Sequence, residues 1–205
     1  MKVLLVNGSL HEKGCTYTAL CEVEKALNAN GVETKIYWIG ESQKTGCKGC
    51  WLCKKSGKCV IEDGVNEFVE KAGEFDGFVF GSPVYYASAA GAMLSFMDRV
   101  FYSGGKKLAY KPAASVVSCR RGGASTTFDV LNKYYTINNM PVVGSNYWNE
   151  VHGNKPEEVL QDEEGLQTMR ILGNNMAWLL KCIELGKQAG LAPERERKIM
   201  TNFIR

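Results

Sequence analysis

The chain has 205 residues, of which 45% are apolar and 23% charged, values that are ordinary for one compact soluble domain. The formal net charge of +3 is nearly balanced and the 25 basic residues are dispersed, so neither nucleic acid nor a membrane surface is expected as a main partner. The apolar run after Met1-Lys2 is too short for a signal sequence or a membrane span, which predicts a cytoplasmic protein.

Five segments are predicted to be strands. The first, residues 2–6, is apolar after Lys2, as expected for a parallel strand that is buried on both faces. The other predicted strands are residues 32–39, 76–82, 112–119 and 141–145.

Helices are predicted between and after these strands. Residues 16–30 carry Leu20, Val23 and Leu27 at helical spacing and stop before Gly31, a residue suited to ending a helix. A long helix at residues 162–186 places apolar side chains at steps of three and four, most simply for core packing. The other predicted helices are residues 65–72, 87–102, 124–138 and a polar one within 191–205.

Strands that alternate with helices predict right-handed crossovers and a doubly wound five-stranded parallel sheet, flanked by helices in a three-layer α/β/α arrangement. The sequence contains no linker or repeat, so we expect a single domain over residues 1–205. It would include a cysteine-rich loop at 46–60 and a C-terminal helical extension at 146–205. Ligands bind outside the carboxyl ends of such strands, which directs attention to the loops after strands one, three and four.

The loop after the first strand combines small residues with hydroxyl side chains: Gly8, Ser9, Gly14, Thr16 and Thr18. Unpaired N–H groups at the start of a helix carry partial positive charge, and hydroxyls donate to phosphate oxygens, so the loop predicts an anion site. The spacing matches neither GxGxxG nor a P-loop. An ordinary helix cap by Ser9 or Thr16 is the simpler alternative.

Four of the eight cysteines, Cys47, Cys50, Cys53 and Cys59, follow the spacing CxxCxxCx5C. Four thiolates in so short a loop can hold a [4Fe–4S] cluster. Zinc is an alternative, although it more usually takes two separated CxxC pairs. Five lysines are the only charged residues between Glu41 and Glu62. They would offset the charge of a cluster, or stabilise reactive thiolates without any metal.

These motifs resemble the NADPH-dependent FMN reductase branch of the flavodoxin-like superfamily. The resemblance rests on Asn7-Gly8-Ser9 with Gly14 and Thr16, on the segment 81–86 (GSPVYY) and on the pair Gly122-Gly123. Within that branch, the segment 46–53 (GCKGCWLC) with Gly57 and Cys59 is similar to the iron-sulfur flavoproteins. The resemblance covers roughly residues 1–145.

The resemblance implies that the first loop holds the phosphate of FMN, the second lines the isoalloxazine ring and the third borders its pyrimidine edge. The cofactor-binding residues expected on this basis are Ser9, His11, Gly14, Cys15, Thr16, Thr18, Pro83, Val84, Tyr85, Tyr86, Ser118, Arg120, Gly122 and Gly123. A tyrosine can cover a flat apolar ring, and glycines let the main chain approach it. Core packing of the tyrosines and solvent exposure of the arginines are the alternatives.

The chain departs from the family pattern at four places, one of them Ala87-Ser88, where Gly-Ser is usual. Leu10-His11 replace a common Pro-Arg, so His11 is left as the cation for the phosphate, and Cys15 replaces a common Asn. An acidic pair is frequent where Asp63-Gly64 stand, and the sequence offers no physical reason for it.

Together these features predict an FMN-dependent NAD(P)H oxidoreductase that passes electrons through a [4Fe–4S] cluster. The donor would be NAD(P)H or ferredoxin and the acceptor a small molecule or a protein. A flavodoxin-like one-electron carrier and a cysteine-based redox sensor remain as alternatives. With only His11 and His152 as imidazoles, no side chain is named as a catalytic acid or base. A homodimer or homotetramer is expected. The aromatic segment 147–152 with Asn154, which has neither a helical nor a strand period, is predicted to be a lid or subunit contact.

Overall fold

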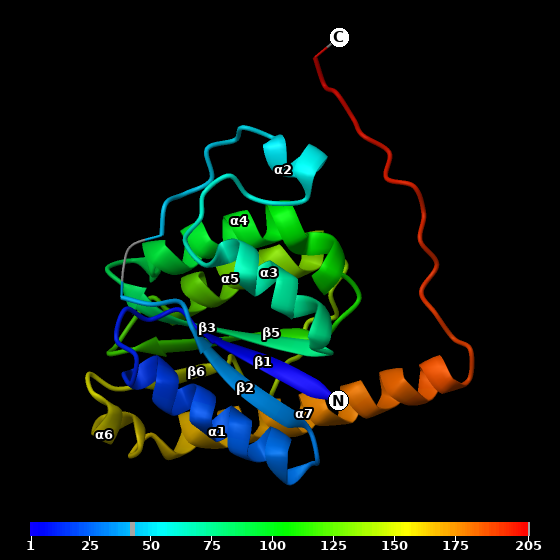
Figure 1. The fold of residues 1–205 in the computed structure, drawn as a ribbon. Coiled ribbons are helices and arrows are strands. Elements are labelled where there is room, and N and C mark those ends of the chain that lie inside the picture. Colours follow the sequence, from blue (N-terminus) through cyan, green and yellow to red (C-terminus); the bar gives the residue numbers. More distant parts are fainter. Residues whose placement is uncertain (42–43, 205) are drawn as a thin grey trace.

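The computed structural model describes residues 1–41 and 44–204 (Figure 1). At its centre lies a sheet in the order β2-β1-β3-β5-β6, in which every neighbouring pair is parallel. The strands are β1 (Lys2–Asn7), β2 (Glu33–Trp38), β3 (Gly77–Tyr85), β5 (Ala113–Cys119) and β6 (Glu150–His152). The predicted doubly wound five-stranded parallel sheet is confirmed. A short sixth strand, β4 (Ser88–Ala89), pairs antiparallel with the end of β3.

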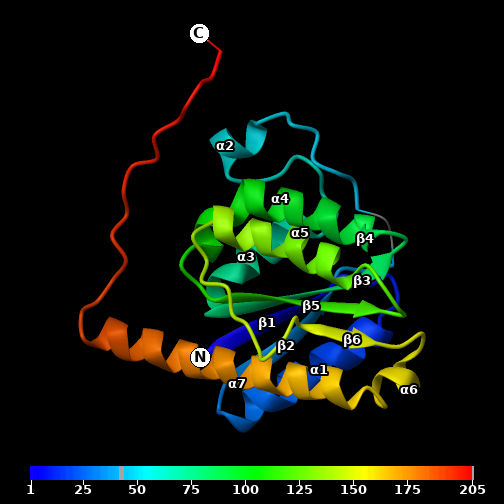
Figure 2. The same ribbon diagram turned by 180° about the vertical axis from the view of Figure 1, so that it is seen from behind.

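Helices cover both faces of the sheet and complete the predicted three layers (Figures 1 and 2). One face carries α3 (Val65–Lys71), α4 (Gly91–Leu108) and α5 (Ala124–Ile137). The other face carries α1 (Cys15–Ala29) and α7 (Glu163–Gln188). Three short elements lie in the connections: α2 (Leu52–Ser56), α6 (Pro156–Val159) and a 3₁₀ turn at Ala72–Glu74.

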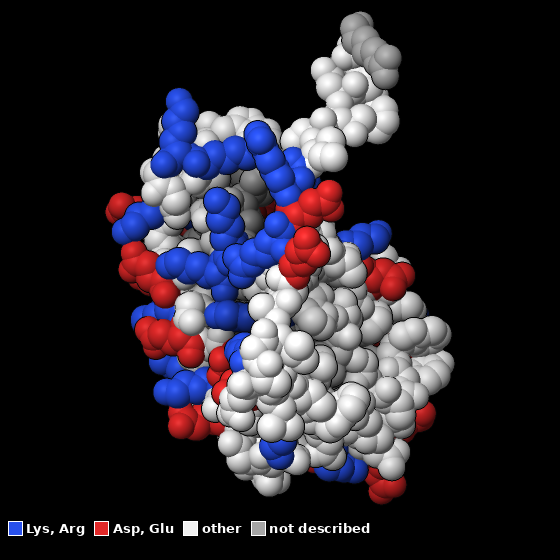
Figure 3. All heavy atoms as spheres, turned by 90° about the vertical axis from the view of Figure 1, so that its right-hand side faces the viewer, with Lys and Arg blue, Asp and Glu red and all other residues white. Residues whose placement is uncertain are grey.

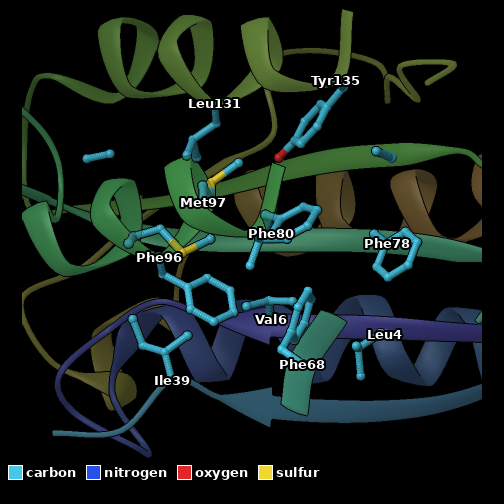
Figure 4. Close-up of a cluster of buried hydrophobic side chains, with 14 of the residues drawn as sticks. Leu4, Val6, Ile39, Phe68, Phe78, Phe80, Phe96, Met97, Leu131 and Tyr135 are labelled. Atoms are coloured by element: carbon cyan, nitrogen blue, oxygen red, sulfur yellow. The ribbon is translucent and has the colours of Figure 1, made fainter. Parts of the chain in front are cut away.

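Side chains of β1 alternate between two apolar cores, one on each face of the sheet. Leu4 and Val6 pack with Phe80 and Phe96 beneath α3 and α4 (Figure 4). Val3 and Leu5 belong instead to the core beneath α1 and α7. Burial on both faces is therefore the reason that this strand is apolar without alternation.

The predicted fifth strand at residues 141–145 is wrong. Only Val142 pairs there, in an isolated bridge with Ala113, and the chain then leaves the sheet. Pairing resumes at β6, where Val151 lies beside Ser118. Because β6 is three residues long and only its central residue is buried, it carries too little apolar pattern to be recognised from sequence.

The helix predicted at residues 87–102 is α4, displaced toward the C-terminus. It starts later because Val84 pairs with Ala89 in the antiparallel turn that precedes it. It also continues through Gly104, where a Cβ atom would lie 2.5 Å from a methyl group of Val69. The glycine is thus a site of close helix packing between α3 and α4 and does not end the helix.

The C-terminal segment also differs from expectation. Within the described residues 191–204 no helix is present, so the predicted polar helix is wrong, and the segment extends away from the body of the protein (Figure 2). None of the described helices has the length and apolar content needed to cross a bilayer.

Candidate functional site

Three loops and one turn enclose a hollow of about 390 Å³ at the carboxyl edge of the sheet. We call this hollow the edge cleft. Ten of the predicted cofactor-binding residues line it: Ser9, His11, Gly14, Cys15, Thr16, Pro83, Val84, Tyr85, Ser118 and Arg120. The structure thus brings together all three loops that follow β1, β3 and β5.

The loop after β1 is held from within by Asn7, which is fully buried. Its amide oxygen accepts the N–H of Ser9 at 3.1 Å, and its amide nitrogen donates to the carbonyl of Glu12 at 2.8 Å. Gly8 passes so close to β3 that an added Cβ would lie 2.8 Å from the carbonyl oxygen of Gly81. Asn7 and Gly8, which precede the lining residues, therefore fix the backbone conformation of this loop.

Neither hydroxyl that was considered as a helix cap has that role. The residue before α1 is Gly14, and among the described residues no side chain caps this helix. The Ser9 hydroxyl accepts the N–H of His11 at 3.1 Å, while the Thr16 hydroxyl lies 2.8 Å from that of Ser118. The first turn of α1 consequently presents its N–H groups to the edge cleft without a side-chain acceptor, which suits an anion.

The end of β3 and the turn that follows it differ in what they contribute to the edge cleft. Pro83, Val84 and Tyr85 line the edge cleft, whereas Tyr86 lies outside its lining and is fully exposed with a φ of 61°. The left-handed backbone at Tyr86 closes the tight turn between β3 and β4, which directs this side chain into solvent.

Three other predicted residues also lie outside the lining: Thr18, Gly122 and Gly123. The Thr18 hydroxyl donates to the carbonyl of Gly14 at 3.2 Å. Gly123 has a φ of 90° at the start of α5, and a Cβ there would lie 2.8 Å from a methyl group of Val84. Its missing side chain thus lets the second and third loops approach one another.

Sequence reasoning missed one wall of the edge cleft, the turn formed by Gly153, Asn154, Lys155 and Pro156. The Cys15 thiol donates to the carbonyl of Gly153 at 3.6 Å, which joins this turn to the start of α1. Burial raises the pKa of the Cys15 thiol, so the thiol stays neutral. The turn was missed because it follows β6, whose position was not predicted.

The four clustered cysteines all line a second hollow, bordered by the loop 47–61 and α4, which we call the cysteine hollow. Cys47 and Cys50 are exposed, whereas Cys53 and Cys59 are half-buried. Among the described residues, no three potential ligands are grouped around the position of a single metal ion. The volume of this hollow is about 30 Å³.

Cys59 is the most firmly held of the four. Its backbone N–H donates to the side chain of Asn66 at 2.8 Å, and that side chain donates back to the Cys59 carbonyl at 2.9 Å. The Nε–H of Arg99 points at the Cys59 sulfur at 3.3 Å. Basic residues gather on the upper half of the face seen in Figure 3, at the height of α2 and α4, and the loop lysines Lys48, Lys54, Lys55 and Lys58 are exposed.

The order of the parallel strands, the helices on both faces and a cleft at the carboxyl edge define a flavodoxin-like α/β protein. The chain is similar in structure to RosB with a bound flavin intermediate, with a TM-score of 0.71 at 15% identity over 100% of this chain and 92% of that one. It is also similar to a flavodoxin from Archaea, with a TM-score of 0.60 at 14% identity over 88% and 99% of the two chains.

The sequence profile of the NADPH-dependent FMN reductase family matches residues 1–155, and the chain belongs to that family. Among its relatives is an iron-sulfur flavoprotein of Methanocaldococcus jannaschii, 32% identical over 195 residues that span 90% of this chain and all of the relative. Another is the iron-sulfur flavoprotein of Methanosarcina thermophila, 28% identical over 90% of this chain and 97% of the relative. The resemblance expected from the motifs is confirmed.

Proposed function

We propose that the chain is an FMN-dependent NAD(P)H oxidoreductase whose cysteine loop carries a [4Fe–4S] cluster. The observation that supports it most is the edge cleft, where loops far apart in sequence meet at the carboxyl edge of the sheet. Its volume of about 390 Å³ falls within the roughly 300–1,000 Å³ of typical ligand pockets.

The lining of the edge cleft fits FMN by its chemistry. Ser9 and the uncapped first turn of α1 would receive the phosphate, with Lys155 as the nearby cation. Pro83 to Tyr85 would lie along the isoalloxazine ring, and Ser118 with Arg120 would border its polar edge. Bound FMN supplies the exchange between two-electron hydride chemistry and single-electron transfer, while the protein positions and tunes it.

The cysteine hollow fits a cluster by its donor set. A [4Fe–4S] cluster takes one thiolate per iron, so its ligands need not converge on one point as they do around zinc. Cys47, Cys50, Cys53 and Cys59 all face this hollow. The exposed lysines of the loop would offset the negative charge of the four thiolates.

We further propose that the protein assembles as a homodimer or homotetramer in the cytoplasm. Large apolar side chains are exposed on α7 and in the C-terminal segment, among them Trp178, Leu185 and Phe203. Trp178 and Leu185 are seven residues apart on α7 and so share one face of it, and an exposed apolar patch marks a contact surface.

The proposed function is tested on protein purified without oxygen. The measurements are the absorption spectrum and the contents of released flavin, iron and acid-labile sulfide. Cys50→Ser should lose the iron and keep the flavin, whereas Cys182→Ser, also an exposed cysteine but on α7, should keep both. NADH or NADPH should then reduce quinone or free flavin in steady state. Flavin without iron would refute the cluster. Rapid oxidation by ferredoxin without any such turnover would favour the one-electron carrier.

A further inference from the structure

Arg99 is a buried charge in the middle of an apolar helix face. It lies on α4 between Phe96 and Val100, which are both buried, and only 1% of its side chain is exposed. Burying a guanidinium costs free energy unless each N–H group has a hydrogen-bond acceptor and the positive charge has a negative partner. The acceptors and the negative partner of the guanidinium therefore indicate the role of Arg99.

All five N–H groups of Arg99 have a partner, and every partner belongs to the segment that contains the cysteine loop. The two Nη atoms each donate to one carboxylate oxygen of Asp63 at 2.6 Å. Nη1 also donates to the carbonyl of Thr45 at 3.1 Å and Nη2 to that of Ile61 at 2.9 Å. The remaining donor, Nε–H, is directed at the Cys59 sulfur at 3.3 Å.

This geometry joins both ends of the cysteine loop to one helix. Thr45 precedes the first of the four cysteines, and Ile61 and Asp63 follow the last. Asp63 balances the charge of Arg99, and interaction with the guanidinium holds the pKa of Asp63 below its usual range despite the opposing effect of partial burial. The pair thus anchors both ends of the loop to α4, while Cys47 and Cys50 between them are exposed.

We propose that Arg99 is a positioning residue that fixes Cys59 as a ligand and raises the reduction potential of the [4Fe–4S] cluster. The inference rests on the cluster assigned above. Reduction adds negative charge to the sulfurs, and a hydrogen bond to a sulfur favours that charge. Salt screens the exposed lysines of the loop, whereas the buried guanidinium is screened much less.

The test is a redox titration of the reconstituted protein, followed by electron paramagnetic resonance, with iron content and melting temperature measured beside it. Arg99→Gln should lower the equilibrium constant for cluster reduction about tenfold, the size of one charge-assisted hydrogen bond, which is about 59 mV for one electron. Asp63→Asn should raise the potential, because it removes a negative charge and leaves the guanidinium uncompensated.

Two further variants make the result decisive. Arg170→Gln breaks an Arg–Glu22 pair on the opposite layer and should leave the potential unchanged. If Arg99→Gln fails to fold or binds no iron, Arg99→Lys replaces it, and a lowered potential is expected because an ammonium cannot serve Asp63 and Cys59 in the same fork geometry.

The inference is overturned if Arg99→Gln and Arg99→Lys bind iron at the wild-type potential. It is also overturned if the Arg99 and Asp63 variants shift the reduction potential in the same direction. Both substitutions break the same ion pair, so a loosened loop alone would shift the potential equally in sign. In either case the cluster itself stands. A wild-type protein that binds no iron after reconstitution refutes the cluster together with this inference.

Discussion

Basic side chains reach the edge cleft from three segments that are far apart in the chain. His11 stands where the family resemblance implies an arginine, Arg120 follows β5, and Lys155 lies in the turn after β6. A lysine ammonium is a common partner of phosphate groups. We therefore expect Lys155, which the sequence did not single out, to replace the missing arginine.

Lys155→Ala should weaken FMN binding about tenfold, or about 1.4 kcal/mol, which corresponds to the loss of one charged contact to a phosphate. The measurement is quenching of FMN fluorescence on titration with apoprotein at low and high salt. Lys181→Ala, an exposed lysine on α7, is the matched control and should bind as the wild type does. Equal affinities for Lys155→Ala and the control would show that Lys155 does not contact the cofactor.

At the scale of elements, α7 packs against α1 and fixes its position. The helices touch at Gly173, where an added Cβ would lie 2.7 Å from the Cβ of Ala26 and 2.9 Å from the carbonyl oxygen of Val23. Because the first turn of α1 forms part of the edge cleft, this contact also sets the position of the predicted anion site.

Gly173→Ala should destabilise the fold by about 1–2 kcal/mol. The added methyl group overpacks the contact between the helices, and this cost exceeds the gain from the higher helix propensity of alanine. Gly186→Ala, in the same helix, has its nearest neighbour 3.9 Å away and should stabilise by about 0.5–1 kcal/mol. Urea denaturation of both variants measures the difference. A stabilising Gly173→Ala would mean that the two helices separate at no cost.

For the whole molecule, the edge cleft exists only when the chain is folded. Its walls come from residues near positions 9, 84, 119 and 154, which are joined by the sheet and not by local sequence. A ligand of this cleft therefore binds the folded state alone and stabilises it.

FMN at one hundred times its dissociation constant should raise the free energy of unfolding by about 2.7 kcal/mol. Thermal unfolding at increasing FMN concentration measures this effect. Riboflavin, which lacks the phosphate, should shift the melting temperature much less at the same concentration. Equal shifts with both ligands would contradict a phosphate site at the start of α1.

The sequence by itself determined the order of the main helices, four of the five parallel strands and the family. Apolar runs such as residues 2–6 and the apolar spacing of α7 carry that information locally, because burial on one or two faces selects residue types directly. Ser9, Pro83 and Ser118 were found because each lies close to the end of a predicted strand, where the family resemblance places contacts to the cofactor.

Only the tertiary structure decided the features that depend on one partner across space. The turn at Lys155 and strand β6 are too short to leave a pattern, and Arg99 looks in sequence like any charged residue of a helix. Its importance, and that of Asp63, comes from atoms more than thirty residues away meeting in one buried network. Sequence patterns record which residues are buried, but the pairing of buried polar groups is set by the packing of elements that lie far apart in the chain.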